Sequence, residues 1–440
     1  MRKGFIFNHD LCVSCKACSA ACLLENGWSV SARKIYTHNR ETFLPEPVIN
    51  LSLACNHCEE PLCLNGCPVS AYFRDPSTGA VIIEEQKCIG CRYCIWNCPY
   101  DAPGINNEEG YIEKCNFCYN RLKEETEPAC TSSCPTGALS FGEIPGQGCL
   151  NDIRWIPEKR INPALKLTGT RENRSLKVIP YDQSTRTVGT PGPVKPKNIS
   201  GEWSLIAFSF LTTVSVAVIL SDLLDGTYFG RMNQLIIVIL AGIFSLFHLK
   251  NRIRAWRAMN NILRSPLSRE IFLFVAYILS LFAAVIFENP PVMIIAVILG
   301  LMLLIAIDSV YTYADKSMSM LFHSGQSFLS GLLIASFIMK AILPFIFLAS
   351  AKLIFNLIAL KRFRRENLYF DIRFIRVAFL IISSVIISTG SGKNIITGYV
   401  IFLAGELLDR ILYYIDFEPL NINISINETI IPNTDEKERS

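Results

Sequence analysis

The 440-residue sequence predicts a protein of two parts, an N-terminal α+β domain rich in cysteine and a C-terminal all-α polytopic membrane bundle of eight helices. Two observations carry this prediction. All 17 cysteines lie between Cys12 and Cys149. From about Gly201 onward the chain is a series of apolar blocks of nearly membrane-spanning length, and the mean hydropathy of the whole chain is positive.

The predicted boundaries follow these shifts in composition. Residues 1–188 form the cysteine-rich domain, residues 189–201 the linker, residues 202–416 the membrane domain and residues 417–440 a polar tail. The linker lies in the stretch VGTPGPVKPKNISGEW, whose proline and glycine residues are typical of loops. The net charge of +4 is too small to indicate nucleic acid, so we expect no such partner.

Sixteen of the 17 cysteines fall into four groups of four. Each group has three residues between its third and fourth cysteines, and in the last three groups the fourth cysteine precedes Pro68, Pro99 or Pro135. The groups are Cys12, Cys15, Cys18 and Cys22; Cys55, Cys58, Cys63 and Cys67; Cys88, Cys91, Cys94 and Cys98; and Cys115, Cys118, Cys130 and Cys134. This is the cysteine run of bacterial ferredoxins, repeated four times.

The spacing has a chemical reason. A two-residue gap lets a short loop curl thiolates onto different irons of one cube, and the fourth cysteine can ligate the neighbouring cube. Groups that exchange their fourth ligands in pairs would hold four 4Fe–4S clusters, which predicts a ferredoxin-like domain. A series of clusters suits the movement of electrons one at a time over a distance. Cys149 is left over, and we interpret it as a structural thiol.

Disulfides and zinc are the alternative uses of these cysteines. A disulfide framework needs an oxidising compartment and usually a signal peptide, but the N-terminal MRKGFIFNHD has no apolar core. Zinc sites use CxxC pairs separated by longer loops, which does not explain a third cysteine after the next two-residue gap. The pattern therefore favours iron–sulfur clusters over both alternatives.

Four basic residues neighbour cysteines in the sequence, namely Lys16, Lys87, Arg92 and Lys114. They could stabilise anionic clusters, which would raise the cluster potentials. The other interpretation is that they are solvated surface charges, and the sequence leaves both open.

From Cys12 to about Phe141 the chain resembles the four-cluster iron–sulfur subunit of the dimethyl sulfoxide reductase family of molybdoenzymes. The phrases CNHCEEPLC, CIGCRYC and CPTGAL are similar to that family's own. The resemblance implies that the first group pairs with the fourth and the second with the third. The implied ligand sets are Cys12, Cys15, Cys18 and Cys134; Cys22, Cys115, Cys118 and Cys130; Cys55, Cys58, Cys63 and Cys98; and Cys67, Cys88, Cys91 and Cys94. Leu23 replaces the proline after Cys22, which we expect to loosen a turn without removing a ligand.

The second half contains eight apolar segments as candidates for membrane helices. They are Ser204–Leu220, Gln234–Leu249, Ile271–Phe287, Val292–Ile307, Leu321–Met339, Ala341–Leu360, Phe374–Ile387 and Ile395–Tyr414. The seventh is short and is preceded by the charged FDIRFIR. An even number of spans would leave both ends of the membrane domain on one side.

The basic loops predict which side that is. The loops KNRIRAWRAMNNILRSPLSRE and KRFRRENLYFDIRFIR each carry six basic residues, whereas the opposite loops ENPP and SGKN carry almost none. Positively charged loops stay in the cytoplasm. We therefore expect a multi-pass protein of the inner (cytoplasmic) membrane with its iron–sulfur domain on the cytoplasmic side.

Ionisable residues inside membrane spans are costly and tend to be functional. Those of the predicted spans are His248, Glu270, Asp308, His323, Glu406, Asp409 and Arg410, and the up-and-down topology places all of them near the cytoplasmic face. We expect them to line a quinone pocket, where histidine suits proton transfer because its pKa lies near neutrality. Alternatively, some of them extend into the lipid headgroups.

From Glu202 to Tyr414 the chain also resembles the eight-helix anchor subunit of dimethyl sulfoxide reductase. The matching phrases are EWSLIAF, FHL with IRAW, LSREI and GELLDRILYY. In that family the histidine after the second span is implicated in menaquinol binding, which implies the same for His248. Arg254 lies in the matching basic loop and is included in the site. Lys250, Asn251 and Arg252 replace the family's Gly-Ser-Pro, so the loop beside the pocket can differ in shape.

The two resemblances together imply a fusion of an iron–sulfur subunit with a membrane anchor. Menaquinol would be oxidised in the membrane, and electrons would pass through four 4Fe–4S clusters to a separate molybdopterin-containing catalytic subunit in anaerobic respiration. Three alternatives remain. Electrons could flow in reverse, from a donor such as sulfite into quinone. His248 and His323 could ligate a haem. The membrane half could be an ion-transport protein driven by the electrons.

Overall fold

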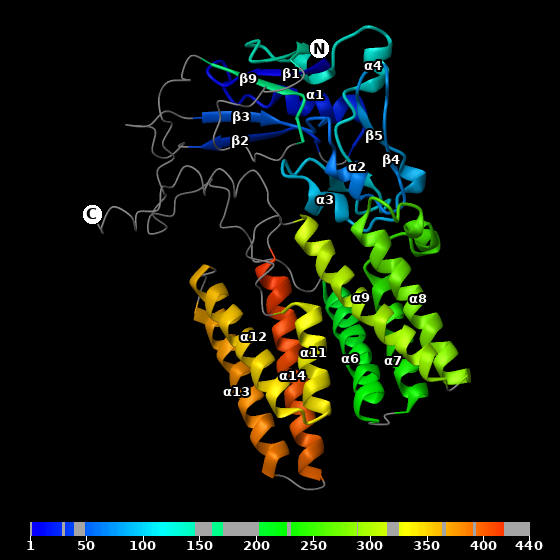
Figure 1. Ribbon diagram of the computed structural model, residues 1–440. Coiled ribbons are helices and arrows are strands. Elements are labelled where there is room, and N and C mark those ends of the chain that lie inside the picture. The colour runs from blue at the N-terminus through cyan, green and yellow to red at the C-terminus, as the bar shows by residue number, and fades with distance from the viewer. Residues whose placement is uncertain are drawn as a thin grey trace. The chain divides into compact units, whose positions relative to one another are not determined.

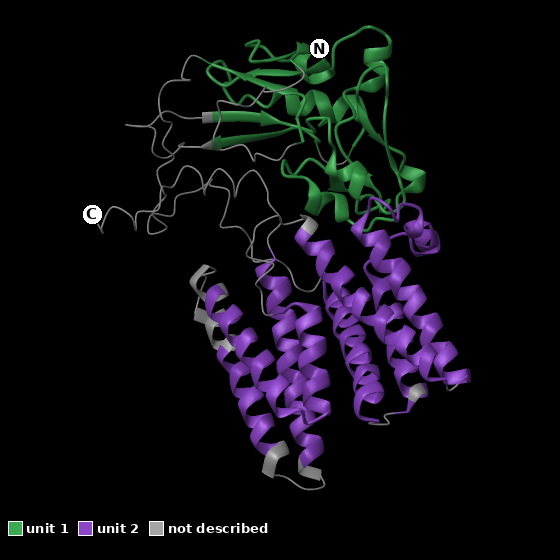
Figure 2. Cartoon of the chain, viewed as in Figure 1, with its two compact units in different colours: residues 1–192, 419–440 green, residues 193–418 purple. Residues whose placement is uncertain are grey.

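In a computed structural model the chain divides into two compact units, residues 1–192 with 419–440 and residues 193–418 (Figure 2). The structure describes residues 2–28, 31–38, 49–145, 161–169, 202–226, 230–287, 289–314, 325–362, 367–389 and 393–417. Cys149, His323, the predicted linker and the tail after residue 417 lie outside the described residues.

The first unit is α+β, as predicted, and is built from short helices that alternate with strands or hairpins, except that two helices, α4 and α5, follow one another (Figure 1). The third cysteine of every group is the second residue of a short helix. These helices are α1 (Ala17–Asn26), α2 (Leu62–Gly66), α3 (Tyr93–Asn97) and α5 (Ala129–Ser132), and α4 spans Tyr119–Lys123. The hairpins are β2 (Lys34–His38) with β3 (Ile49–Leu53), β4 (Tyr72–Arg74) with β5 (Val81–Ile83), and β6 (Gly104–Ile105) with β7 (Ile112–Glu113).

Strand β1 (Arg2–Asn8) is the centre of the largest described sheet. It pairs antiparallel with β8 (Leu139–Ile144) and parallel with β9 (Leu165–Thr168). Side chains alternate between the faces of a strand, so Phe5 and Phe7 point the same way, and both are 1% exposed. The sheet thus closes one side of the core with strands from both ends of the unit's sequence.

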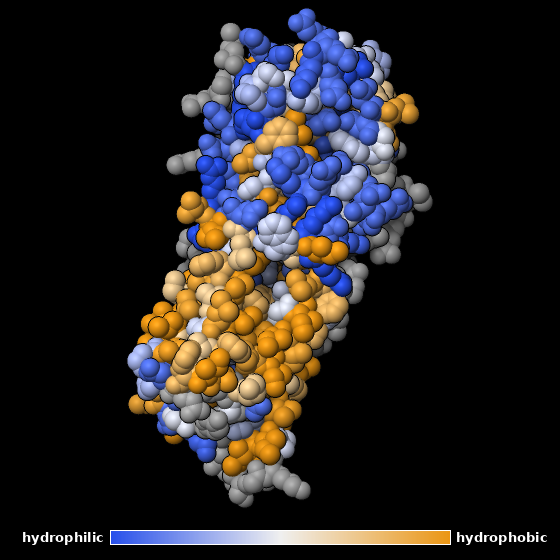
Figure 3. Space-filling model, turned by 90° about the vertical axis from the view of Figure 1, so that its right-hand side faces the viewer, coloured by the Kyte–Doolittle hydropathy of each residue, from blue (hydrophilic) through white to orange (hydrophobic). Residues whose placement is uncertain are grey.

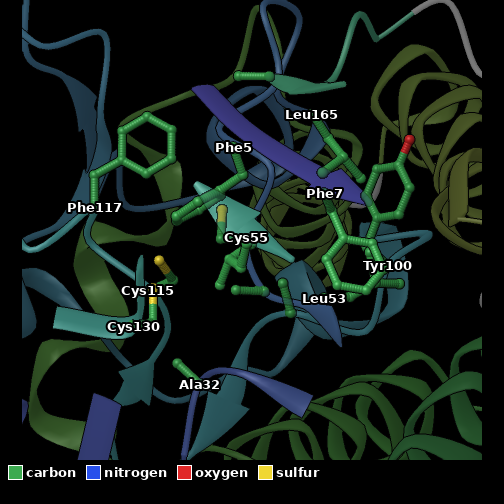
Figure 4. Packing of buried hydrophobic residues seen from close by; sticks show 14 of the residues in the cluster. Phe5, Phe7, Ala32, Leu53, Cys55, Tyr100, Cys115, Phe117, Cys130 and Leu165 are labelled. Carbon is green, nitrogen blue, oxygen red and sulfur yellow. The ribbon is translucent and has the colours of Figure 1, made fainter. Parts of the chain in front are cut away.

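Several cysteines are buried members of this core. Figure 4 shows Cys55, Cys115 and Cys130 among apolar side chains that include Phe5 and Phe117. The rings of Phe5 and Phe117 meet edge to face, with centroids 5.2 Å apart. Aromatic rings of this size exclude water from the thiols.

The second unit is helical. Its described helices are α6 (Trp203–Asp225), α7 (Arg231–Phe247), α8 (Pro266–Phe287), α9 (Pro290–Ala314), α11 (Ser327–Ile338), α12 (Ile342–Arg362), α13 (Asn367–Thr389) and α14 (Lys393–Asp416), with the 3₁₀ helix η4 (Arg252–Met259). Three of them, α6, α8 and α9, are long and apolar enough to cross a membrane. A fourth candidate is the pair of α7 and η4, which is bent by 108°.

Several helices differ from the predicted segments. Helix α13 begins at Asn367, so the charged FDIRFIR lies inside the helix and not before it. Arg376 of that stretch is 3% exposed, because it packs against carboxylates of α14. Helix α11 begins at Ser327, and the earlier part of the predicted segment Leu321–Met339 falls partly outside the described residues.

The surfaces of the two units differ in polarity. The large apolar side chains that the structure exposes come mostly from α7, α8, α9, α12, α13 and α14. Figure 3 shows them as a broad hydrophobic surface on the helical unit, whereas the visible face of the first unit is mainly hydrophilic. An apolar surface of this size is expected for a unit that is embedded in lipid.

The pair Gly4–Gly142 across β1 and β8 provides a test of the sheet. A methyl group on Gly4 would lie 2.6 Å from the Ala164 carbonyl oxygen and would overlap Ile144. Gly4→Ala should therefore destabilise the full-length protein by about 1–3 kcal/mol through overpacking, seen as a lower Tm in mild detergent. Gly142→Ala is the control, because its methyl group meets only Ile6, at 3.7 Å. Equal Tm values for the two variants would contradict the described register.

Candidate functional site

None of the sixteen described cysteines forms a disulfide. Burial raises the pKa of the Cys12 thiol, and repulsion from Cys18, Cys134 and Cys15 adds to it. Most of the other thiols have their neighbours within one set, whereas Cys115 neighbours Cys55 as well as Cys22 and Cys130. Set 1 is Cys12, Cys15, Cys18 and Cys134; set 2 is Cys22, Cys115, Cys118 and Cys130; set 3 is Cys55, Cys58, Cys63 and Cys98; and set 4 is Cys67, Cys88, Cys91 and Cys94. The sets are named after the grouping that the family resemblance implies, which stays a prediction.

A repeated backbone conformation curls each CxxC loop. The residue before the second cysteine of the loop has a positive φ in all four groups. These residues are Ser14 (56°), His57 (41°), Gly90 (67°) and Phe117 (64°). Only glycine adopts this region without a steric cost, so three of the four loops carry backbone strain that the surrounding packing must offset.

A second repeated device turns the chain after the fourth cysteine. The N–H groups of Ser70, Asp101 and Gly137 donate to the carbonyl oxygens of Cys67, Cys98 and Cys134, each at 3.3 Å. Proline in the second position of the turn has the required φ and cannot continue a helix. The chain therefore leaves the short helix at the fourth cysteine, whose thiol joins a different set from its three predecessors.

The expectation of a loosened turn at Cys22 is wrong. Leu23 has the N–H group that proline lacks, so α1 continues through Cys22 to Asn26 and ends at Gly27, whose φ is 65°. Cys22 still joins set 2, because the helix itself points its thiol toward Cys130. A longer helix here replaces the turn without the loss of a thiol.

Lys114 is the buried lysine of the thiol region. It is 2% exposed, and its Nζ lies 3.6 Å from Cys55 Sγ of set 3. Nζ also donates to the carbonyl oxygens of Cys115, at 2.9 Å, and of Val81. Burial alone would lower the pKa of Lys114, but the charges of the Cys55, Cys63 and Cys115 thiolates together raise it. Lys114 therefore lies between sets 2 and 3 as a cation.

Arg33 occupies the corresponding place between sets 1 and 2, and sequence reasoning missed it because it lies in no cysteine motif. It is 2% exposed, and its Nη1 donates to Ser52. Burial alone would lower the pKa of Arg33, but the charges of Cys130, Cys115 and Cys18 raise it. A buried cation near three cysteines of two sets is a feature that only the tertiary structure shows.

The other basic residues that neighbour cysteines in the sequence differ from Lys114 in burial. Lys16 is exposed, and Lys87 is half-exposed in an ion pair with Glu84, 2.8 Å long. Arg92 is partly buried at the start of α3, with a φ of 61°. The prediction of a cluster-stabilising cation therefore has structural support at Lys114, whereas Lys16 and Lys87 are surface charges.

Three buried side chains each lie near thiols of two sets. Arg33 joins sets 1 and 2, and Lys114 joins sets 2 and 3. Tyr72 lies near Cys94 of set 4 and Cys63 of set 3. Burial and the charges of these two cysteines raise the pKa of Tyr72. Four adjacent metal groups arranged in this way would form a continuous path for electrons.

The residues fit iron–sulfur cubes. Nε and Nη2 of Arg33 are buried and have no hydrogen-bond partner of normal geometry among the described residues, a costly state that acceptor sulfides near the thiols would relieve. Within the described part of the chain, no three cysteine, histidine or carboxylate side chains are arranged to hold a single metal ion. The four cysteines of a cube bind different irons, so they need not converge on one point.

The predicted quinone residues are only partly brought together. His248 follows α7 directly and is half-buried, Arg254 lies in η4, and Glu270 is a buried residue of α8. Arg410 Nη1 lies 3.8 Å from Asp308 Oδ1, and the charges of both residues act on Glu270. The structure therefore groups Glu270, Asp308 and Arg410, and the described contacts do not join His248 or Arg254 to them.

Asp308 and Arg410 also have clear packing roles. The carboxylate of Asp308 accepts from the backbone N–H groups of Ser327, at 2.9 Å, and Phe328, at 3.1 Å. It thus binds the N-terminal end of α11, where a negative charge is favourable. Arg410 Nε donates to Ser209 of α6 at 2.9 Å, and its guanidinium lies over the Tyr413 ring, 4.6 Å from the centroid.

Glu406 and Asp409 lie in a separate network of buried ion pairs. Lys352 Nζ is 2.6 Å from Glu406 and 2.8 Å from Asp409, and Arg376 Nε is 3.0 Å from Asp409. Lys352 also donates to Ser330, so α11, α12, α13 and α14 all contribute. Sequence reasoning overlooked Lys352, although a single lysine within the apolar LASAKLIFN was the signal.

The sequence of the first unit is similar to those of known iron–sulfur proteins. Residues 48–144 match the 4Fe–4S dicluster domain family. Over 151 residues the chain is 39% identical to the probable anaerobic dimethyl sulfoxide reductase chain YnfG of Escherichia coli, a match that covers 32% of this chain and 73% of that protein. The thiosulfate reductase electron transfer subunit PhsB of Salmonella typhi is 34% identical over 167 residues, which cover 36% of this chain and 83% of that protein.

A third relative comes from a dehydrogenase. The B subunit of the sulfite dehydrogenase of Allochromatium vinosum is 30% identical over 164 residues, covering 32% of this chain and 68% of that protein. The matches cover the ferredoxin-like unit, which this chain combines with a helical unit that has three or four candidate membrane spans. The chain belongs to the family of iron–sulfur electron-transfer subunits of the dimethyl sulfoxide reductase type.

Proposed function

We propose that this chain is both the electron-transfer subunit and the membrane anchor of a respiratory molybdoenzyme complex. Menaquinol is oxidised in the helical unit, and electrons pass through four 4Fe–4S clusters to a molybdopterin-containing catalytic subunit on another chain. The observation that carries the proposal is the presence of sixteen cysteines in four ferredoxin-type groups on the same chain as an apolar helical unit. Dimethyl sulfoxide or another S- or N-oxide is the proposed acceptor.

The cysteines of sets 1 to 4 would hold the clusters, and each cluster would supply a one-electron carrier. The chain's own residues exclude water and compensate charge. Backbone N–H groups such as that of Ala71, 3.3 Å from Cys67 Sγ, direct their dipoles at the thiolates. Hydrogen bonds to cysteine sulfur raise the reduction potential of a bound cluster, since they favour the more negative reduced state.

We also propose eight membrane spans in the inner membrane, with the iron–sulfur unit on the cytoplasmic side. The shorter apolar helices Ser327–Ile338, Ile342–Ile358 and Phe374–Ile386 supply further apolar segments. Lys352 lies ten residues from each end of α12, about 15 Å along the axis. Its burial against two carboxylates makes a charge at that depth compatible with lipid around the bundle.

The proposed quinone site consists of His248, Arg254, Glu270, Asp308 and Arg410. It also includes Glu406 and Asp409, which form ion pairs with Lys352. Oxidation of a quinol releases two electrons and two protons, so the site needs bases. Glu270 is a buried carboxylate near Arg410 and Asp308, and its carboxylate is the first candidate proton acceptor. The imidazole of His248 is the second candidate base.

One observation favours a second direction of electron flow. The similarity to the B subunit of a sulfite dehydrogenase relates this chain to a complex whose name describes oxidation of its substrate. The same row of clusters would then carry electrons into the quinone pool. The haem alternative depends on His323, which lies outside the described residues.

Purification from native membranes without oxygen tests the proposed function. We expect about sixteen irons per copy of this chain from four 4Fe–4S clusters, together with molybdenum and a large co-purifying polypeptide. Iron without molybdenum or a large partner would contradict the molybdoenzyme assignment. A reduced b-type haem band in the same preparation would favour the haem-bearing anchor.

His248→Ala tests the quinone site. It should abolish electron transfer from a menaquinol analogue while iron content and cluster EPR signals stay as in the wild type, because the residue lies in the helical unit. Reduction of the clusters by dithionite should also be unaffected. Lys250→Ala, an exposed change two residues away, is the control. Unchanged quinol turnover in His248→Ala would refute the site.

Lys352→Met tests the buried ion network. Loss of the lysine leaves Glu406 and Asp409 with insufficient positive charge, and breaking a buried pair in this way costs about 3–5 kcal/mol. The Tm of the purified complex in detergent should fall. Lys340→Met is the matched control, because that lysine is exposed at the end of α11. If both variants have the same Tm as the wild type, the network does not stabilise the bundle.

A further inference from the structure

Two cations are buried among the thiols without any carboxylate to balance them. Arg33 and Lys114 are each 2% exposed. Among the described residues, neither forms an ion pair with aspartate or glutamate, in contrast to the buried Lys352 of the helical unit. Burying an unpaired charge is costly, so the fold must hold negative charge elsewhere near these two residues.

The thiols of the sets are the described neighbours that would supply this negative charge, because a cluster binds the thiolate form. Lys114 Nζ lies 3.6 Å from Cys55 Sγ of set 3 and is held by the carbonyl of Cys115 of set 2. Arg33 Nη1 donates to Ser52 Oγ at 3.2 Å, and that hydroxyl lies 3.5 Å from Cys18 Sγ of set 1. Cys130 and Cys115 of set 2 are the other thiols near the guanidinium. The guanidinium also stacks on Phe5, 4.3 Å from the ring centroid, which fixes its plane. Each cation therefore bridges two neighbouring sets.

A cluster gains one negative charge when it is reduced. A fixed cation at short range in a dry core stabilises the reduced form more than the oxidised form, which raises the midpoint potential. A cation between two clusters acts on both, and an exposed cation is screened by water. Position relative to the sets, rather than proximity in sequence, decides which clusters are affected.

We propose that Arg33 and Lys114 set the midpoint potentials along the row of clusters. Arg33 raises those of the clusters held by sets 1 and 2, and Lys114 raises those of the clusters held by sets 2 and 3. The cluster of set 2 receives both contributions, and that of set 4 receives neither. This inference rests on the proposed function, because it requires assembled clusters.

The test is a redox titration monitored by EPR on the full-length complex, with iron content measured on the same samples. Lys114→Met should lower the midpoint potentials of two of the four clusters by at least about 59 mV. For one electron this is a tenfold change in the equilibrium constant for reduction. Arg33→Met should also shift two clusters, one of them in common with Lys114→Met. Lys114→Arg, which keeps the charge, should restore potentials near those of the wild type.

Lys87→Met is the matched control. Lys87 precedes Cys88 in the sequence just as Lys114 precedes Cys115, but it is half-exposed and paired with Glu84. Its removal should leave all four potentials unchanged. An equal shift in Lys87→Met and Lys114→Met would show a nonspecific effect of lysine removal and would overturn the inference.

The possible failures are distinguishable. Wild-type protein without about sixteen irons would refute the proposed function itself. A full iron content with unchanged potentials in Lys114→Met and Arg33→Met would overturn only the role of the two cations. Loss of iron from both methionine variants would also overturn it, because the residues would then serve folding and not the potentials.

Discussion

The crowding of sixteen thiols, most of them buried or partly buried, within one small α+β unit is the constraint on which the rest of that unit depends. Thiolates repel one another and lose solvation when they are buried, and both effects raise their pKa values; burial and the neighbouring charges raise the pKa of Cys98 to about 11. Metal ligation is the natural compensation, since iron binds the thiolate form. The buried cations and the backbone N–H groups directed at sulfur provide the remainder within the protein.

The fold meets this constraint by repeating a local unit. A curled CxxC loop leads to a short helix that carries the third cysteine, and a proline turn then sends the fourth thiol to another set. Because the fourth ligand is exchanged, no group can complete its set alone. The first and last groups are joined in this way, and β1 pairs with β8 in the same sheet. The ligand exchange and the pairing of β1 with β8 thus both connect the beginning of the unit to the region of its last cysteine group.

Charge is handled differently in the helical unit. Lys352 and Arg376 face Glu406 and Asp409, so cations and carboxylates are balanced inside the protein. Arg410 and Asp308 form a second pair, which leaves Glu270 as a buried carboxylate in excess. An excess carboxylate is where a membrane protein can accept a proton at low cost in structure. The packing of α14 against its neighbours and the proposed quinone chemistry therefore draw on the same group of residues.

The sequence by itself determined the division into two parts and the α+β class of the first. It also determined which sixteen cysteines are candidate cluster ligands, because ligand spacing and apolar segment length are local properties of the chain. The grouping of the sixteen thiols was implied by family resemblance and stays a prediction; the structure places Cys12 near Cys15, Cys18 and Cys134, and Cys115 near Cys55 as well as Cys22 and Cys130. Only the tertiary structure decided that Lys114 is buried and Lys87 is not, although both precede a cysteine. It also brought Arg33 to the thiols and Lys352 to α14, since contacts between residues far apart in the chain depend on packing that no local pattern records.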